Sequence, residues 1–227
     1  MASEGHAPVI CVDGPSGSGK GTIAQRVAAA LGFHLLDSGA LYRLTALAAA
    51  RAGVDWDSPD ALAQTAARMR PHFEPGEGGA MRITLDGVDV TEAIRGEAVG
   101  MNASRVAAEP AVRAALLQRQ RDFRQPPGLV ADGRDMGTVV FPDAELKLFL
   151  TASARERAER RHKQLKEKGI DANLSNLLQD IEARDAHDAQ RGASPMAAAD
   201  DAIVIDSTAR SVDSVTDEAL ERARRVL

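Results

Sequence analysis

The feature that most constrains this chain is a glycine-rich stretch between a short apolar run and an amphipathic segment. The apolar run, residues 8–13, predicts a buried strand. The glycine-rich stretch reads Gly14-Pro15-Ser16-Gly17-Ser18-Gly19-Lys20-Gly21-Thr22. A helix is predicted to follow from about Lys20 to Leu31, with Ile23, Val27 and Leu31 on one face. A strand, a tight loop and a helix in this order favour an α/β fold.

The spacing within this stretch predicts a phosphate-binding loop. Gly14 is followed by four residues and then by Gly19-Lys20, which is the P-loop pattern. Glycines let backbone N–H groups approach phosphate oxygens, the helix N-terminus attracts the anion, and Lys20 neutralises phosphate charge. We therefore predict that Lys20 is catalytic and that ATP is bound by Gly14, Pro15, Ser16, Gly17, Ser18, Gly19, Lys20, Gly21 and Thr22.

The residue after the lysine departs from the general pattern. A serine or threonine usually binds magnesium at that position, but here Gly21 occupies it and Thr22 comes next. A direct bond from Thr22 to the metal is therefore left open. The order Gly-Lys-Gly-Thr resembles nucleoside monophosphate kinases rather than GTPases or motor ATPases.

Strands and helices are predicted to alternate along most of the chain. Further strands are predicted at residues 33–36, 128–131, 145–150 and 202–206, and further helices at 41–51, 58–69, 98–108, 110–124, 153–168, 174–191 and the C-terminus. Ser58 is expected to be the N-cap of its helix, with Pro59 at the first helical position. This alternation predicts one domain, residues 1–227, of the P-loop NTPase type. We expect a three-layer αβα fold with a parallel sheet and its ligands beyond the carboxyl ends of the strands.

Residues 65–96 interrupt the alternation and predict a small β-containing insert. Residues 71–79 are rich in proline and glycine and are expected to form a loop. Apolar residues then alternate over 81–85 and again over 88–90, on either side of Asp86-Gly87. This dipeptide between two alternating runs predicts a tight β-hairpin.

Composition excludes several classes of protein. The net charge is −5 and aromatic residues make up 3 %, which argues against a nucleic-acid polymer as partner. No run approaches the ~20 apolar residues of a membrane span. The first eight residues lack the charged-then-apolar order of a signal peptide, and Cys11 is the single cysteine, expected to be buried in a strand. We therefore expect a cytoplasmic protein.

Four separated motifs extend the resemblance to a particular family. Residues 36–43 read Leu-Asp-Ser-Gly-Ala-Leu-Tyr-Arg, and residues 131–138 read Ala-Asp-Gly-Arg-Asp-Met-Gly-Thr. Arg184-Asp185 is followed by Asp188 and Arg191. Together with the loop at 14–22, and in this order, these motifs resemble bacterial cytidylate kinases over nearly the whole chain. That family also carries a hairpin insert, which matches residues 65–96, and the resemblance implies that this insert binds the nucleoside monophosphate.

The resemblance implies roles for individual residues. Arg43 and Arg134 match the arginines that hold the phosphate of the acceptor nucleotide, and Asp132 matches an aspartate that orders Mg²⁺ through water. Arg157 matches an arginine that lies on the ATP base. The implied acceptor-binding residues are Ser38, Arg43, Ser104, Arg113, Asp135, Arg184, Asp188 and Arg191, and the implied catalytic residues are Lys20, Arg134, Arg161 and Arg184.

The chemistry of these residue types agrees with a phosphorylated cytosine nucleotide. Guanidinium groups donate paired hydrogen bonds to a phosphate dianion. Cytosine presents an amino donor and two acceptors, which serine, aspartate and arginine can match, whereas uracil reverses part of that pattern. CMP and dCMP are therefore the expected acceptors, with Mg²⁺ and ATP on the donor side.

Basic residues gather on the two helices predicted near residues 154–191. Arg157 and Arg161 are four residues apart on one helix, and Arg184 and Arg191 are seven apart on the next, so each pair shares a face. We predict a lid that brings these arginines over the phosphates, while Lys163, Lys166 and Lys168 face solvent. His187 stands between Arg184 and Arg191 and receives no role.

Two alternatives remain at this point. One is another small-molecule P-loop kinase, such as a UMP/CMP, adenylate or shikimate kinase, against which the insert and the Asp132–Asp135 segment argue. The other is a nucleotide-dependent switch, although the chain has no Asn-Lys dipeptide with which to read guanine. Nothing in the sequence requires an oligomer, so a monomer is expected.

Overall fold

The computed structural model describes residues 6–75, 81–167, 169–189 and 196–227. The chain divides into two compact units: residues 1–37 with 121–227, and residues 38–120. Among the described residues, the helices are too short or too polar to cross a membrane.

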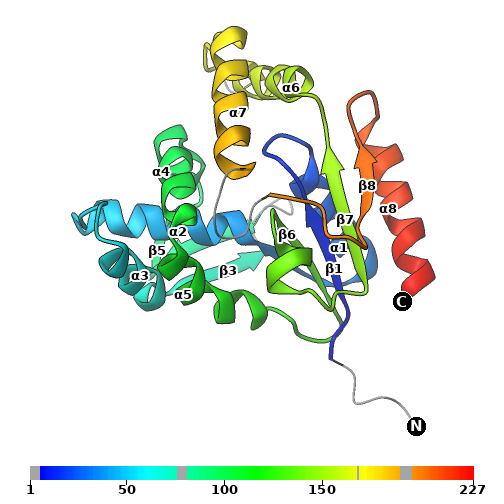
Figure 1. Cartoon of the computed structure of the whole chain (residues 1–227), viewed down its shortest axis with the longest axis horizontal. Helices are drawn as coiled ribbons and strands as arrows, with labels where there is room; N and C mark the ends of the chain where they lie inside the picture. The colour runs from blue at the N-terminus through cyan, green and yellow to red at the C-terminus, as the bar shows by residue number, and fades with distance from the viewer. Residues whose placement is uncertain (1–5, 76–80, 168, 190–195) are drawn as a thin grey trace. The chain divides into compact units, whose positions relative to one another are not determined.

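The first unit is built on a five-stranded sheet (Figure 1). Its strands are β1 (Val9–Asp13), β2 (His34–Asp37), β6 (Leu129–Gly133), β7 (Leu146–Thr151) and β8 (Ile203–Asp206). They are ordered β2-β6-β1-β7-β8, and each neighbouring pair is parallel. In the β1–β6 register, Val12 lies opposite Asp132 and Asp13 opposite Gly133. The chain therefore leaves both central strands at the same edge of the sheet, as the alternating pattern predicted.

Two helices of this unit pack on one face of the sheet. They are α1 (Lys20–Leu31) and α8 (Val212–Val226), and α8 begins where Ser211 Oγ accepts a hydrogen bond from Ser214 N–H at 3.1 Å. Their apolar faces meet the strands in a core that includes Ile10, Val27 and Val215. Burying such side chains stabilises the fold by about 1.5–3 kcal/mol each.

Two further helices, α6 (Ala154–Glu167) and α7 (Leu174–Ala189), follow β7 and pack against each other (Figure 1). A short π-helix, η3 (Met136–Val140), follows β6 and was not predicted. Its first turn is fixed by the buried carboxylate of Asp13, which accepts hydrogen bonds from Met136 N–H at 2.9 Å and Gly137 N–H at 2.8 Å. A contact so distant in sequence leaves no local pattern to detect.

The second unit combines helices with a small antiparallel sheet. Its elements are α2 (Ser38–Arg51), α3 (Pro59–Arg68), β3 (Pro71–Pro75), β4 (Met81–Leu85), β5 (Val88–Asp89), the 3-10 helix η2 (Ala93–Arg95), α4 (Glu97–Ala108) and α5 (Pro110–Arg121). The predicted hairpin is confirmed: β4 pairs with β5, and Asp86 and Gly87 have φ of 51° and 83°. Those positive values are what a tight hairpin turn between twisted strands requires.

Three local predictions need correction. Residues 71–75 form the strand β3 rather than a loop, while 76–79 lie outside the described residues. The prolines are tolerated because β3 is an edge strand that pairs only with β4 among the described strands. Ser58 precedes α3, but its side chain makes no capping hydrogen bond. The helix expected from residue 41 begins at Ser38, directly after β2.

The three-stranded sheet lies within residues 65–96, as expected for the insert, although the compact unit around it extends from 38 to 120. The helices α2 and α4 account for this larger extent because they pack against each other. A nucleotide-binding role for the insert, and a lid formed by residues 154–191, stay predictions.

Candidate functional site

The loop between β1 and α1 depends on glycine at two positions. Gly14 has φ of 146°, and a Cβ there would lie 2.1 Å from the carbonyl oxygen of Leu150 in β7. Gly19 has φ of 92° and directly precedes α1, so it turns the chain into the helix. An L-residue at either position would be strained. The sequence folds locally into a tight loop at the N-terminus of a helix, which is an anion-binding arrangement.

Lys20 and Asp132 lie together at this end of the sheet. Lys20 Nζ is 3.7 Å from Asp132 Oδ1, which has no hydrogen-bond partner among the described residues. The other carboxylate oxygen lies 3.1 Å from where a Cβ on Gly21 would stand, so this glycine admits the carboxylate. Burial raises the pKa of Asp132 to about 6, and the charge of Lys20 acts in the opposite direction. The pair is the charged centre of the site.

The end of α7 brings further predicted residues to the same unit. Arg134 Nε donates to Asp188 Oδ2, and Asp188 is fully buried. Arg184 Nη1 donates to Ser16 Oγ at 3.4 Å. Arg134 therefore contacts the end of α7, and Arg184, one turn earlier on α7, contacts the loop after β1. Asp188, which the resemblance includes among the acceptor-binding residues, is engaged here with Arg134.

Arg157, which the resemblance places on the ATP base, contacts the phosphate-binding loop and α7. It is 3 % exposed, and its Nη1 donates to Ser16 O and to Asp185 Oδ1, each at 3.0 Å. This leaves almost no guanidinium surface on which a base could lie, so its role on the base stays a prediction. Arg161 is half-buried on α6, and Arg191 lies outside the described residues.

In the second unit, two of the predicted acceptor residues, Arg43 and Ser104, lie on α2 and α4. Arg43 Nη1 donates to Ile94 O at 2.8 Å, and its guanidinium lies 3.2 Å from where a Cβ on Gly100 would stand. Ser104 Oγ is 3.4 Å from Gly100 O, one turn earlier on α4. The structure therefore groups Arg43 and Ser104 around the start of α4.

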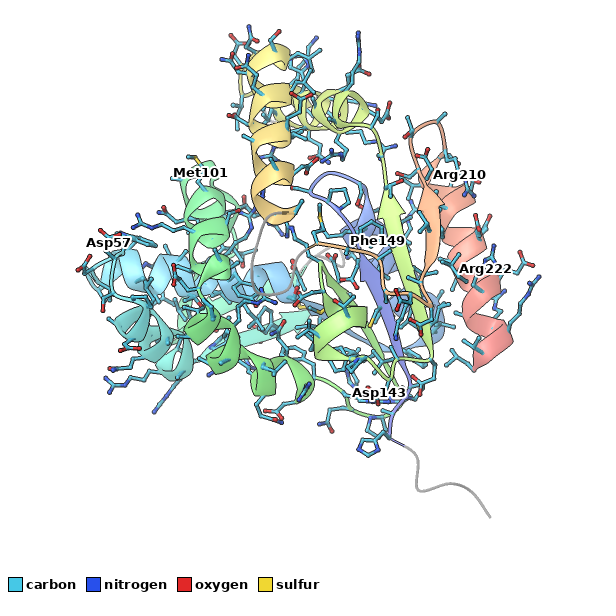
Figure 2. The ribbon with its side chains drawn as sticks, in the orientation of Figure 1. Asp57, Met101, Asp143, Phe149, Arg210 and Arg222 are labelled. Carbon is cyan, nitrogen blue, oxygen red and sulfur yellow. The ribbon has the colours of Figure 1, made fainter. Side chains whose placement is uncertain are left out.

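The other two acceptor residues of this unit lie on α5 and at the start of α2. The guanidinium of Arg113 is 5.8 Å from the centre of the Tyr42 ring. Ser38 is buried at the first position of α2. Met101, also on α4, is 75 % exposed (Figure 2).

Sequence reasoning missed four polar residues that the structure places around the loop: Asp13, Arg160, Asp185 and Ser207. Asp13 ends an apolar strand and hydrogen-bonds across to η3. Arg160 and Ser207 both contact Ser18 O. Asp185 pairs with Arg157. Only Asp185 stood in a motif, and none could be assigned without knowing which segments meet.

Asp13 predicts a pH dependence of stability. Burial raises its pKa to about 7, against the opposing effect of the two N–H donors of η3. A carboxyl group with a higher pKa in the folded than in the unfolded chain binds its proton more tightly when folded. Its contribution to stability is therefore greatest below pH ~4 and is lost as the pH rises through about 7.

We expect the free energy of unfolding of the wild type, minus that of Asp13→Asn, to fall by ~1–3 kcal/mol between pH 4 and pH 8. Urea unfolding at a series of pH values measures this difference. The matched control is Asp217→Asn, on the exposed side of α8, which is expected to give a flat difference. A flat difference for Asp13→Asn as well would contradict the prediction.

The first unit combines a parallel sheet with a glycine-rich loop that enters α1. Lys20 after this loop pairs with Asp132 of β6, the strand beside β1 in the sheet. These features define a P-loop fold of the kinase class. Comparison with known proteins makes the assignment narrower. A family model described as cytidylate kinase matches residues 10–225, and the chain belongs to that family.

Curated relatives agree over nearly the whole chain. A cytidylate kinase of Pseudomonas aeruginosa (strain UCBPP-PA14) is 56 % identical over 222 residues, covering 97 % of each chain. A cytidylate kinase of Chromobacterium violaceum is 57 % identical over 214 residues, covering 94 % of each. A solved gluconokinase of Sinorhizobium meliloti 1021 is 19 % identical with a TM-score of 0.46, covering 97 % of this chain and 93 % of that one.

Proposed function

We propose that this protein transfers the γ-phosphoryl group of ATP to CMP and dCMP, giving the diphosphates. The observation that carries the proposal is the pairing of Lys20, at the N-terminus of α1, with Asp132. Arg134 and Arg184 lie in the same unit, paired with Asp188 and Ser16. A lysine and arginines there can stabilise the charge that spreads over a transferring phosphoryl group.

The proposed step is an in-line displacement without a covalent enzyme intermediate. A phosphate monoester has its second pKa near 6, so the attacking oxygen of the acceptor is already largely ionised at neutral pH. A general base is therefore unnecessary, and none of the five histidines is given a role. The residues of this chain bind and orient the two nucleotides and neutralise their phosphate charge. The loop and Lys20 act on the donor phosphates, and Arg43 and Arg134 act on the acceptor phosphate.

Mg²⁺ is the proposed partner of ATP, and Asp132 fits it. Its carboxylate is nearly buried and has one oxygen without a hydrogen-bond partner among the described residues. No group of three or more histidine, cysteine or carboxylate side chains in the described ranges could hold a metal. A single carboxylate suits Mg²⁺, which takes its other ligands from phosphates and water. When bound, the metal would neutralise charge on the transferring phosphates, and Thr22 is a second candidate contact.

The residues proposed to bind the acceptor are divided between the two units. Ser38, Arg43, Ser104 and Arg113 belong to residues 38–120, and Asp135, Arg184, Asp188 and Arg191 to the other unit. Arg161 is proposed to act on the transferring phosphates with Lys20, Arg134 and Arg184. We propose a monomer in the cytoplasm, because net acidity, a single buried cysteine and the lack of any sequence feature requiring a partner favour it.

Acceptor choice is the direct test of this function. With Mg-ATP, CMP and dCMP are expected to be the best acceptors, and UMP weaker by roughly 10²-fold or more in kcat/KM, because unmatched buried polar groups are costly. A coupled assay of ADP release across CMP, dCMP, UMP, AMP, GMP and dTMP measures this. Equal turnover of AMP and CMP would indicate an adenylate-type kinase. Slow ATP hydrolysis that is independent of every acceptor would indicate a switch.

A further inference from the structure

Arg157 makes contacts with three segments at once. Its Nε donates to Ala152 O at 2.9 Å, at the end of the β7 segment, and its Nη1 donates to Ser16 O in the phosphate-binding loop at 3.0 Å. Both terminal nitrogens also donate to the carboxylate of Asp185 on α7. The stem lies against the loop, because a Cβ on Gly17 would be 3.1 Å from Arg157 Cβ.

Arg160, one turn further along α6, contacts a second carbonyl of the loop, that of Ser18. Its Nη1 is 3.3 Å from Ser18 O and 3.2 Å from Ser207 Oγ, and its Nη2 donates to Ser207 O at 2.6 Å. Ser207 Oγ itself donates to Ser18 O at 2.9 Å. Ser207 lies in the turn after β8, where its carbonyl oxygen accepts a hydrogen bond from Arg210 N–H at 3.2 Å. Glu156 accepts from Arg160 Nε and keeps the side chain in this orientation.

Holding a carbonyl oxygen fixes the direction of the next N–H group. In a trans peptide the C=O and the following N–H point in opposite directions. Fixing Ser16 O therefore directs Gly17 N–H away from Arg157, and fixing Ser18 O directs Gly19 N–H away from Arg160. Gly17 and Gly19 both have positive φ, at 80° and 92°, and glycine can turn either peptide plane over at little cost. The arginines remove that freedom.

We propose that Arg157 and Arg160 are positioning residues, which hold the phosphate-binding loop by the carbonyls of Ser16 and Ser18 and so present the N–H groups of Gly17 and Gly19 to the donor phosphates. This inference rests on the proposed function, since it takes the donor to be a nucleoside triphosphate. It differs from contact with the ATP base, because its target is the polyphosphate chain.

Two other cations on α6, Arg155 and Lys166, do not share this geometry. Arg155 is exposed and pairs with Glu159 four residues later on the same helix. Lys166 is also exposed. Arg157 and Arg160 instead reach residues more than 140 positions earlier in the chain. Side chains on a solvated helix face would not make such contacts, so Arg157 and Arg160 support the phosphate-binding loop.

Two ligands separate the proposal from a base contact: ATP, and inorganic tripolyphosphate, which has no base. Calorimetry with wild type, Arg157→Met, Arg160→Met and the control Arg155→Met gives the affinities. Both ligands are expected to bind roughly tenfold more weakly to the first two variants, since charge-assisted hydrogen bonds that orient the loop are lost. Arg155→Met is expected to stay within about twofold of wild type. The KM for CMP is expected to change less than the KM for ATP.

Arg160→Lys and Ser207→Ala keep the test decisive if a methionine variant does not fold. The lysine keeps the charge but cannot hold both carbonyls, so tripolyphosphate binding is expected to weaken, and Ser207→Ala is expected to weaken it less. Weaker ATP binding with unchanged tripolyphosphate binding would overturn the proposal in favour of a base contact. Lower thermal stability with unchanged affinity for both ligands would also overturn it. A wild type that binds tripolyphosphate but does not phosphorylate CMP would instead refute the proposed function.

Discussion

Lys20→Ala is expected to lower kcat by roughly 10²–10⁴-fold, because removing a group that stabilises transition-state charge acts mainly on the chemical step. The KM for ATP is expected to change less, since the N–H groups of the loop remain. Lys20 Nζ lies beside the buried Asp132, 3.7 Å from one carboxylate oxygen. Steady-state kinetics with Mg-ATP and CMP measures the effect.

The same substitution has a second expected consequence, at Asp132. Lys20 lowers the pKa of that carboxyl group against the raising effect of burial, so its removal is expected to raise the pKa further. Lys166→Ala, at an exposed position on α6, is the matched control and is expected to keep kcat within about twofold. Thermal unfolding checks that both variants are folded. A folded Lys20→Ala with near-normal kcat would show that the loop does not act on a transferring phosphoryl group.

The fold followed from the sequence wherever a local pattern carried the information. The parallel sheet and the helix Lys20–Leu31 were predicted from apolar spacing and from the glycine-rich loop, and both are confirmed. The hairpin around Asp86-Gly87 was predicted because its turn demands positive φ, and it is confirmed. The family membership inferred from four ordered motifs is also confirmed.

The sequence did not predict features that depend on distant partners. The π-helix after β6 is fixed by Asp13, more than 120 residues earlier in the chain. The strand β3 escaped prediction because prolines at both of its ends are typical of a loop, and only its edge position permits them. The burial of Asp13 and the edge position of β3 both depend on the order of strands in a sheet, and apolar spacing does not reveal that order.

The candidate site shows the same division. Spacing predicted that Lys20 follows the loop at the start of a helix, and the structure places it at the first position of α1. The direction of each arginine could not be inferred. Arg157 and Arg161 share a helix face by spacing, yet Arg157 is almost fully buried against the loop while Arg161 is half-buried. Helical periodicity gives the face of a side chain but not the partner that it meets. The roles of the individual site residues stay predictions.

Arg184→Ala is expected to lower turnover by roughly 10²-fold and to weaken closure of the lid predicted for residues 154–191, because each arginine–phosphate contact contributes about 1.5–3 kcal/mol. Arg184 reaches Ser16 Oγ at 3.4 Å, and its neighbour Asp185 pairs with Arg157, so this end of α7 is in contact with the loop. Bound phosphates are expected to draw the remaining cationic groups of α6 into closer contact.

Hydrogen exchange tests the lid over the described part of this segment, residues 154–167 and 169–189, with no ligand, with an ATP analogue, and with the analogue and CMP together. Protection is expected to rise at each step in the wild type and to rise less in Arg184→Ala, while Lys166→Ala behaves as the wild type. Arg157 of the predicted lid is paired with Asp185, and Arg134, which follows β6, is paired with Asp188. Repulsion among the cations is therefore weaker than charge counting suggests. The gain in protection is therefore expected to be largest away from these pairs, in the part of α6 from Arg161 to Glu167. Equal protection in all three states would contradict the lid. It would mean that α6 and α7 belong to the static core and do not move when the charged ligands bind.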